Sequence, residues 1–106
     1  MQSNTPQESI DWLNANDLCN ASMINTDILI QIVEYGIIEP TGSSLSTWQF
    51  TPSSVAITCK ALRLYHDLEL DWAATAIAVG LLEQLEEERR KNQYLEARLA
   101  RLLGES

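Results

Sequence analysis

Basic residues are missing from the first half of this 106-residue chain, in which Lys60 is the first lysine or arginine. Six acidic residues precede it with no cation to offset them: Glu8, Asp11, Asp17, Asp27, Glu34 and Glu39. The net charge is −8 at pH 7. Because lysine and arginine supply most of a protein's affinity for nucleic acid by neutralising phosphates, this distribution argues against direct binding of nucleic acid.

Groups that carry catalysis or hold metals are also scarce. The chain has one histidine, His66, and two cysteines, Cys19 and Cys59, which form no Cys-x-x-Cys pair. Asp67 adjoins His66, but neighbouring side chains on a helix point about 100° apart and form no relay. No nucleophile motif or glycine-rich phosphate loop occurs. The sequence therefore predicts no catalytic, metal or cofactor site, and we expect both cysteines to lie in the core.

Long apolar runs are absent as well. No stretch approaches the ~20 apolar residues that span a bilayer, and the start MQSNTPQES lacks the pattern of a secretory signal. The composition, 45% hydrophobic and 21% charged, is typical of a globular domain. We therefore expect one cytoplasmic domain with no membrane segment.

Two short helices are predicted near the N-terminus. Residues 1–9 are polar and aperiodic, which predicts a flexible arm. An extended piece from Ile10 leads to Asn14 or Asn16, either of which can cap a first helix. Asn25 or Thr26 can cap a second helix, which Gly36 ends. The apolar residues of this second helix recur at helical spacing, which indicates a helix-turn-helix: Ile28, Leu29, Ile32 and Val33.

The next segment predicts a β hairpin, or wing, and a third helix. The β-prone runs 37–38 and 48–50 are separated by turn formers, and Trp48 is expected to pack the wing onto the helices. Thr51 and Pro52 are suited to open a helix that closes near residues 67–69. Its apolar positions are Val55, Ile57, Cys59, Leu62 and Leu64.

A long last helix is predicted from Trp72 to about Leu103, capped by Asp71 and stopped by Gly104. Its heptad positions form a mostly apolar seam: Ala74, Ala78, Leu81, Leu85, Glu88, Asn92, Leu95, Leu99 and Leu102. A helix of this length exceeds what so small a domain can cover, so the seam predicts a homodimer. The alternative is a helix that folds back on its own domain. We expect the dimer interface to comprise Leu81, Leu85, Asn92, Leu95, Leu99 and Leu102.

This order of elements resembles the MerR-like winged helix-turn-helix architecture, mostly α with a small β wing and a long C-terminal helix. The stretches IVEYGIIEP (32–40), STWQF (46–50) and RLYHDLELDWAATAIAVGLLEQLEEER (63–89) are similar to the CbpM chaperone-modulatory family. The resemblance covers about residues 13–103. We expect a flexible arm at 1–9, a winged core at 10–70 and a dimerisation helix at 71–103.

The resemblance implies an adaptor, not an enzyme, that binds the J-domain of a CbpA-type, DnaJ-like co-chaperone. Such an adaptor would inhibit co-chaperone activity with Hsp70 and the DNA binding of CbpA. The acidic residues predict a surface suited to a basic partner. Two clusters combine carboxylates with an aromatic ring, and we expect one of them to bind the J-domain: Asp27, Glu34 and Tyr35, or Glu69, Asp71 and Trp72. The rival hypothesis is a MerR-type transcriptional regulator that binds DNA.

Overall fold

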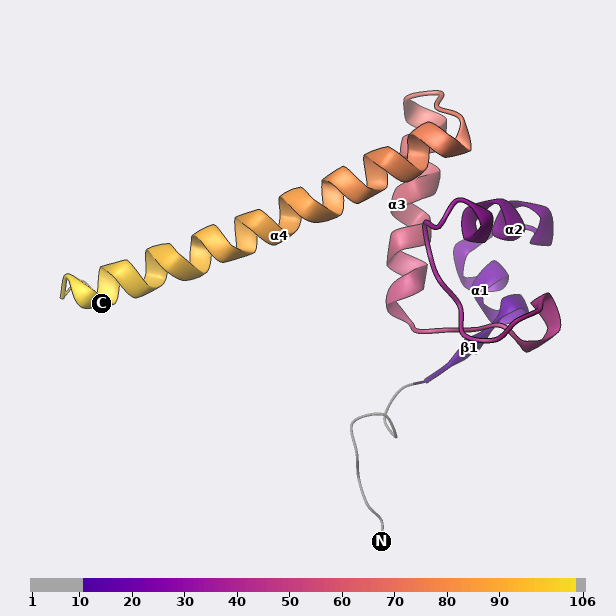
Figure 1. The fold of residues 1–106 in the computed structure, drawn as a ribbon, viewed down its shortest axis with the longest axis horizontal. Coiled ribbons are helices and arrows are strands. Elements are labelled where there is room, and N and C mark those ends of the chain that lie inside the picture. Colours follow the sequence, from indigo (N-terminus) through magenta and orange to yellow (C-terminus); the bar gives the residue numbers. More distant parts are fainter. Residues whose placement is uncertain (1–10, 105–106) are drawn as a thin grey trace, which may run out of the picture.

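The computed structural model describes residues 11–104, which are mostly helical (Figure 1). The predicted arm at 1–9 and Ile10 lie outside the described residues. In chain order the elements are β1 (Leu13–Asn14), α1 (Ala15–Ser22), α2 (Thr26–Glu34), the 3-10 helix η2 (Leu45–Thr47), β2 (Gln49–Phe50), α3 (Ser53–Asp67) and α4 (Trp72–Leu102). The predicted mostly α fold with a small sheet and a long last helix is confirmed. We call residues 13–67, from β1 to α3, the head.

Side-chain caps decide where the first two helices begin. Asn14, not Asn16, caps α1: its Oδ1 accepts from the Asp17 amide at 2.7 Å, and Asp17 Oδ2 accepts from the Asn14 amide at 3.2 Å. Asn25 caps α2 through a 2.9 Å bond from the Ile28 amide. Gly36 follows α2 with φ 74°, as its predicted role requires. Each cap satisfies a backbone donor that the helix cannot pair, worth about 1 kcal/mol.

The wing differs from the prediction in its strand pairing. β2 pairs with β1, Leu13 opposite Phe50 and Asn14 opposite Gln49, and Thr41 adds an isolated bridge to Gln49. Residues 37–38 form no strand, because the Ile37 amide donates to the Ile32 carbonyl at 3.0 Å and so closes α2, while Ile38 is buried in the core. The predicted hairpin between 37–38 and 48–50 is therefore wrong.

The core of the head lies between α1, α2 and the wing. Its fully or nearly buried residues are Leu18, Cys19, Leu29, Ile32, Ile38 and Phe50. Trp48 contacts Phe50 edge to face, with ring centroids 6.1 Å apart, and packs the wing onto the helices as expected. Burial raises the pKa of the Cys19 thiol, and a hydrogen bond with Thr26 offsets part of that shift. Cys19 is thus a core residue, whereas Cys59 is only partly buried.

Helix α3 buries small residues rather than the predicted large ones. Ser54, Thr58 and Ala61 are buried, whereas the five predicted apolar positions are only partly buried. Small side chains let α1 and α4 pack closely against α3, which explains why the larger residues lie beside the contact and not in it. Pro52 already has helical dihedrals, φ −58° and ψ −28°, so α3 begins where the proline predicts.

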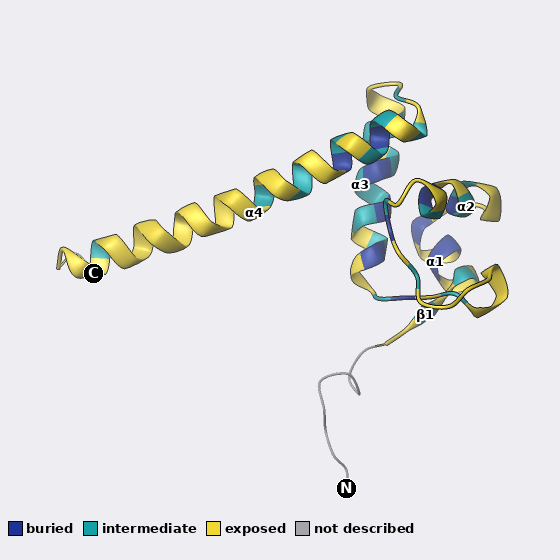
Figure 2. Cartoon of the chain, in the orientation of Figure 1, coloured by how far each residue is buried: buried dark blue, intermediate teal, exposed yellow. Residues whose placement is uncertain are grey.

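Helix α4 packs on α3 over its first half and then leaves the head (Figures 1 and 2). Thr75 and Val79 are buried, and Asp71 Oδ1 caps the helix by accepting from the Ala74 amide at 2.8 Å. Lys60 of α3 reaches Glu83 at 3.0 Å and Glu86 at 2.8 Å. Beyond Glu86 every residue to 102 is exposed except Ala100, which is partly buried. We call residues 87–102 the projecting half. The helix does not fold back on its own domain.

Candidate partner-binding surfaces

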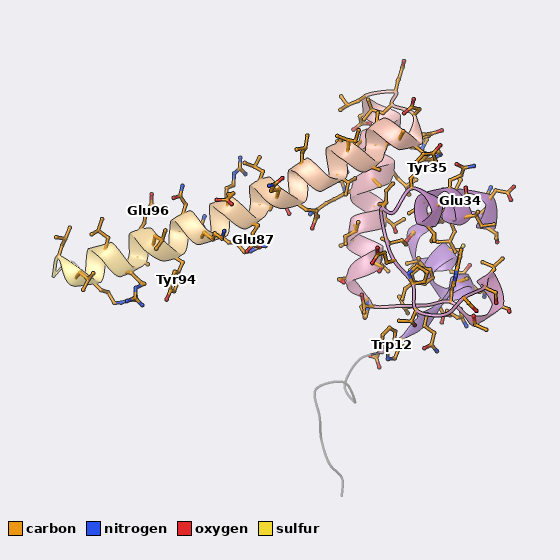
Figure 3. All side chains as sticks on the ribbon, viewed as in Figure 1. Trp12, Glu34, Tyr35, Glu87, Tyr94 and Glu96 are labelled. Atoms are coloured by element: carbon orange, nitrogen blue, oxygen red, sulfur yellow. The ribbon has the colours of Figure 1, made fainter. Side chains whose placement is uncertain are left out.

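The first predicted cluster lies on the outer side of α2. Asp27 and Glu34 are exposed and stand seven residues apart, so two helical turns place both carboxylates on one face of α2. Tyr35 follows directly and is 46% exposed. Figure 3 shows Glu34 and Tyr35 together at the end of α2. The structure therefore brings these three residues to one surface, which we call the α2 acidic face.

No positive charge compensates the α2 acidic face locally. Among residues 11–104 the ion pairs lie on α4 or between α3 and α4, and none includes Asp27 or Glu34. Residues 11–59 contain no lysine or arginine, and Glu39 adds a further exposed carboxylate. A helix that reads DNA in this kind of fold presents cations to phosphate. The α2 acidic face would instead repel phosphate and attract a basic surface.

The second predicted cluster, at the α3–α4 turn, is already engaged within the chain. Asp71 uses its carboxylate to cap α4, and Trp72 stacks on Tyr65 with ring centroids 4.0 Å apart and planes inclined by 13°. Glu69 has a positive φ of 52° and is exposed. Two of the three residues thus stabilise the junction between α3 and α4. The α2 acidic face has more groups free for a partner.

The predicted seam forms one exposed apolar stripe along α4. Its leucines keep large exposed fractions: Leu81 61%, Leu85 47%, Leu95 59%, Leu99 55% and Leu102 79%. The buried residues Thr75 and Val79 face α3 from nearly the opposite side of the helix. Thus the seam residues from Leu81 to Leu102, Asn92 included, are exposed, whereas Ala74 and Ala78 are partly buried. Figure 2 shows the projecting half almost wholly exposed.

The heptad pattern missed Ile77, which is 65% exposed on the same side of α4 as the seam. The strict heptad count assigns Ile77 to a flanking position, although it lies one turn before Leu81. The four-residue spacing between Ile77 and Leu81 is the sequence signal that identifies Ile77 as part of the apolar stripe. Ile77 widens the stripe where its core positions are small, at Ala74 and Ala78.

Side chains suited to chemistry do not converge in the part of the chain that the structure describes. Residues 11–104 contain no group of three or more His, Cys, Asp or Glu side chains arranged to hold a metal. His66 is exposed and contacts the Tyr65 ring edge to face, with centroids 5.4 Å apart. No helix in this range is long and apolar enough to cross a membrane. A shallow hollow of about 180 Å³ lies at Arg98, Arg101 and Leu102, near the exposed end of α4.

The chain is similar in sequence to known proteins over most of its length. Residues 13–97 match the family described as MerR HTH family regulatory protein. Relatives named chaperone modulatory protein CbpM include one from Pseudomonas putida strain F1, 34% identical over 86% of this chain and 90% of its own length. Another, from P. putida strain GB-1, is 36% identical over 84% and 88%. A third, from Escherichia coli O1:K1, is 31% identical over 83% and 87%.

These relatives are named chaperone modulatory proteins, and the family model matches this chain through the head and most of α4. The helix-turn-helix and the wing fall within the matched residues, and so does α4 up to residue 97. The chain therefore belongs to the CbpM family of chaperone modulatory proteins, within the MerR helix-turn-helix family.

Proposed function

We propose that this protein is a cytoplasmic adaptor that modulates a CbpA-type co-chaperone by binding its J-domain through the α2 acidic face. Family membership supports the partner class, since its relatives are named chaperone modulatory proteins. The observation that carries the proposal is a displayed helix with two unpaired carboxylates and an exposed tyrosine, in a head without a cation before Lys60.

The mechanism that this surface supports is occlusion. The J-domain helix that engages Hsp70 is positively charged, so an acidic face that covers it competes directly with Hsp70. Carboxylates at Asp27 and Glu34 pair with lysine or arginine, and the ring of Tyr35 packs against their aliphatic stems. We propose that the same occupation of CbpA also inhibits its DNA binding. No reaction or cofactor is required.

We further propose that the protein acts as a homodimer joined along the α4 seam. Five leucines on one side of a helix remain largely exposed in the single chain, and contiguous apolar surface of this kind marks an interaction site. The projecting half gains little stability from its local ion pairs, which join Glu87 with Arg90 and Glu88 with Lys91. A second seam would bury these leucines.

Titration calorimetry with a purified J-domain tests the binding proposal. Charge attraction is screened beyond about 8 Å at physiological ionic strength, so the dissociation constant should rise when salt is raised several-fold. The matched control repeats the titration with the J-domain of a variant CbpA whose basic helix has been neutralised. A dissociation constant indifferent to salt would remove the electrostatic mechanism.

A MerR-type regulator that binds DNA is the second candidate, because the family match covers the helix-turn-helix. The uncompensated carboxylates of α2 oppose it. A gel-shift at low salt, where phosphate contacts are strongest, distinguishes the two functions. Tight duplex binding by the isolated protein would favour the regulator, whereas free duplex at all protein concentrations would favour the adaptor.

A further inference from the structure

The cations of the chain are concentrated in the projecting half of α4. Residues 87–102 hold five of the seven lysines and arginines against three carboxylates, a net charge of +2. The head has five carboxylates and two cations, a net charge of −3. Because a surface of one sign attracts partners of the other sign, the two regions are suited to different partners. The five cations of the projecting half are Arg89, Arg90, Lys91, Arg98 and Arg101.

Three of these arginines form a row with a tyrosine along one face of the helix. Arg90, Tyr94, Arg98 and Arg101 are spaced four, four and three residues apart, which keeps them within a sector about 80° wide. All four residues are exposed, Tyr94 by 59%. The row extends about 16 Å along the helix. We call these four residues the basic row.

The basic row lies away from the apolar seam. Its centre is roughly 135° around α4 from the centre of the seam, and Arg98 is the member nearest to the seam. Figure 3 shows Tyr94 and Glu87 on one side of the projecting half and Glu96 on the other. The head does not cover the row, since residues 87–99 are all exposed. The row therefore remains accessible whether or not the seam is covered.

Two arginines at the end of the basic row are positioned for an anionic group. Arg98 Nη1 donates to Tyr94 Oη at 3.2 Å, and the guanidinium carbon lies 5.8 Å from the centre of the tyrosine ring. Arg98 and Arg101 also line the shallow hollow of about 180 Å³. Among the ion pairs of residues 11–104, none includes either arginine. Two guanidinium groups beside such a hollow are suited to a carboxylate, which accepts paired hydrogen bonds from arginine.

The shape and charge of the basic row favour a protein partner over nucleic acid. Arg90 is paired with Glu87, so two arginines keep uncompensated charge, too few for an affinity that depends on neutralising many phosphates. The row is one helix face wide and about three turns long, which matches the face of another helix. Arginine and tyrosine are also enriched among the residues that carry protein–protein affinity.

We propose that the basic row binds an acidic α-helix of a partner protein. Carboxylates at matching spacing on that helix pair with Arg98 and Arg101, and the Tyr94 ring packs against the aliphatic parts of the acidic side chains. The α2 acidic face and the basic row then give one chain two docking surfaces of opposite charge. This inference adds a second class of partner and does not depend on J-domain binding by the head.

Fluorescence anisotropy with a labelled peptide tests the basic row. The probe is an alanine-based helical peptide of about four turns, with glutamates at spacings of four, four and three residues. The same peptide with glutamines is the reference. The wild-type chain should bind the glutamate peptide at low salt, where exposed charges are least screened, and should not bind the glutamine peptide. Absence of binding, or equal binding of both peptides, would overturn the proposal.

Charge removal on and off the row provides the matched control. Arg98→Gln/Arg101→Gln should weaken binding of the glutamate peptide on the order of fivefold, because each exposed ion pair contributes modestly. Arg63→Gln/Arg89→Gln removes the same charge from α3 and from another face of α4, and should bind like wild type. Circular dichroism should show unchanged helicity in both variants. Equal weakening in the two variants would show that only net charge matters and would refute the row as a site.

Duplex DNA in place of the peptide tests the other occupant. At the same salt the duplex should bind more weakly than the glutamate peptide. Tighter duplex binding that Arg98→Gln/Arg101→Gln abolishes would overturn the acidic-helix proposal and make nucleic acid the occupant. The peptide is titrated into the chain alone, so a J-domain that fails to bind would refute the proposed function and leave the peptide result unchanged.

Discussion

The head and the projecting half of α4 hold their folds by opposite means. The head buries Leu18, Leu29, Ile32 and Phe50 almost completely and has side-chain caps at both of its first helices. The projecting half buries none of its leucines. Its contacts are short-range pairs on one helix, such as Tyr94 with Arg98 and Glu87 with Arg90. Figure 3 labels Tyr94 and Glu87 on this part of α4.

This difference shows that the two regions depend on different surroundings. Local helix pairs contribute about 0.2–0.5 kcal/mol each, and an isolated helix of some four turns is marginal in water. The proposed contact with a second copy along the seam would supply the apolar burial that the projecting half lacks in the single chain. The head has its own core, and its exposed carboxylates are free to serve a partner.

The largest expected effect comes from breaking the seam. Leu95→Asp/Leu99→Asp should raise the dimer dissociation constant by at least about 100-fold, because losing each buried leucine costs roughly 2–5 kcal/mol. Multi-angle light scattering should show monomers. Gln93→Asp/Ala97→Asp places the same charges on the far side of the same helix and should remain dimeric. A seam variant that stays dimeric with unchanged helicity would show that the interface lies elsewhere.

Charge reversal on the head should have the next largest effect. Asp27→Lys/Glu34→Lys should weaken J-domain binding on the order of tenfold to a hundredfold without lowering the melting temperature. Glu87→Lys/Glu96→Lys makes the same charge change on the projecting half and should bind normally. If both the α2 variant and Glu69→Ala/Trp72→Ala bind like wild type, the J-domain site lies on neither predicted cluster.

Substituting two buried threonines should change the free energy of unfolding by about 1 kcal/mol each, a smaller effect than those above. The Thr58 hydroxyl has no hydrogen-bond partner among the described residues, whereas that of Thr75 donates to the Asp71 carbonyl at 2.8 Å. Thr58→Val should therefore raise the free energy of unfolding by about 1 kcal/mol, and Thr75→Val should lower it by about the same. Chemical denaturation measures both. Destabilisation by Thr58→Val would indicate a hydroxyl partner at that site.

The smallest effect concerns the junction between α3 of the head and α4, where Lys60 pairs with Glu83 and Glu86. Hydrogen bonds with Glu86 and then Glu83 raise the pKa of Lys60, and the hydrogen bond from Lys60 lowers the pKa of Glu86. The Glu86 contribution is present above its ordinary pKa, about 4, and is lost as pH falls through the lowered value. The Lys60 contribution is present below about pH 10 and is lost as pH rises through the raised value.

Lys60→Met should therefore lower the melting temperature slightly between about pH 5 and pH 10, with the difference shrinking at both extremes. Differential scanning calorimetry across this range measures it. Arg90→Met, which removes a pair within α4, serves as the matched control and should leave the junction unaffected. A difference that is constant from acid to alkali would show that the lysine acts through packing of its stem.

Local signals predicted several of the helix boundaries. The cap of α4 at Asp71, the stop at Gly36 and the closure of α3 at Asp67 follow from side-chain and backbone preferences that act within a few residues. The choice between Asn14 and Asn16 depended on the Asp17 carboxylate, which stands three residues after Asn14 and completes its capping box.

Pairing across the chain was not predictable from the same signals. The sequence contains two β-prone runs with turn formers between them, which predicted that the two runs pair. In the structure Ile38 is buried in the core, and β2 pairs with β1 instead. Likewise, periodicity does not tell which face of a helix meets a close neighbour, so Ser54, Thr58 and Ala61 replaced larger residues at the α3 contact.

The sequence by itself determined the charge of the head, the length of α4 and the apolar seam, because composition and periodicity do not depend on packing. The tertiary structure alone decided which of these features remain available. It turned the seam away from α3, engaged Asp71 and Trp72 in the α3–α4 junction, and left Asp27 and Glu34 exposed. The physical reason is that availability depends on which side of each helix the core covers, and the core is made by residues far apart in the chain.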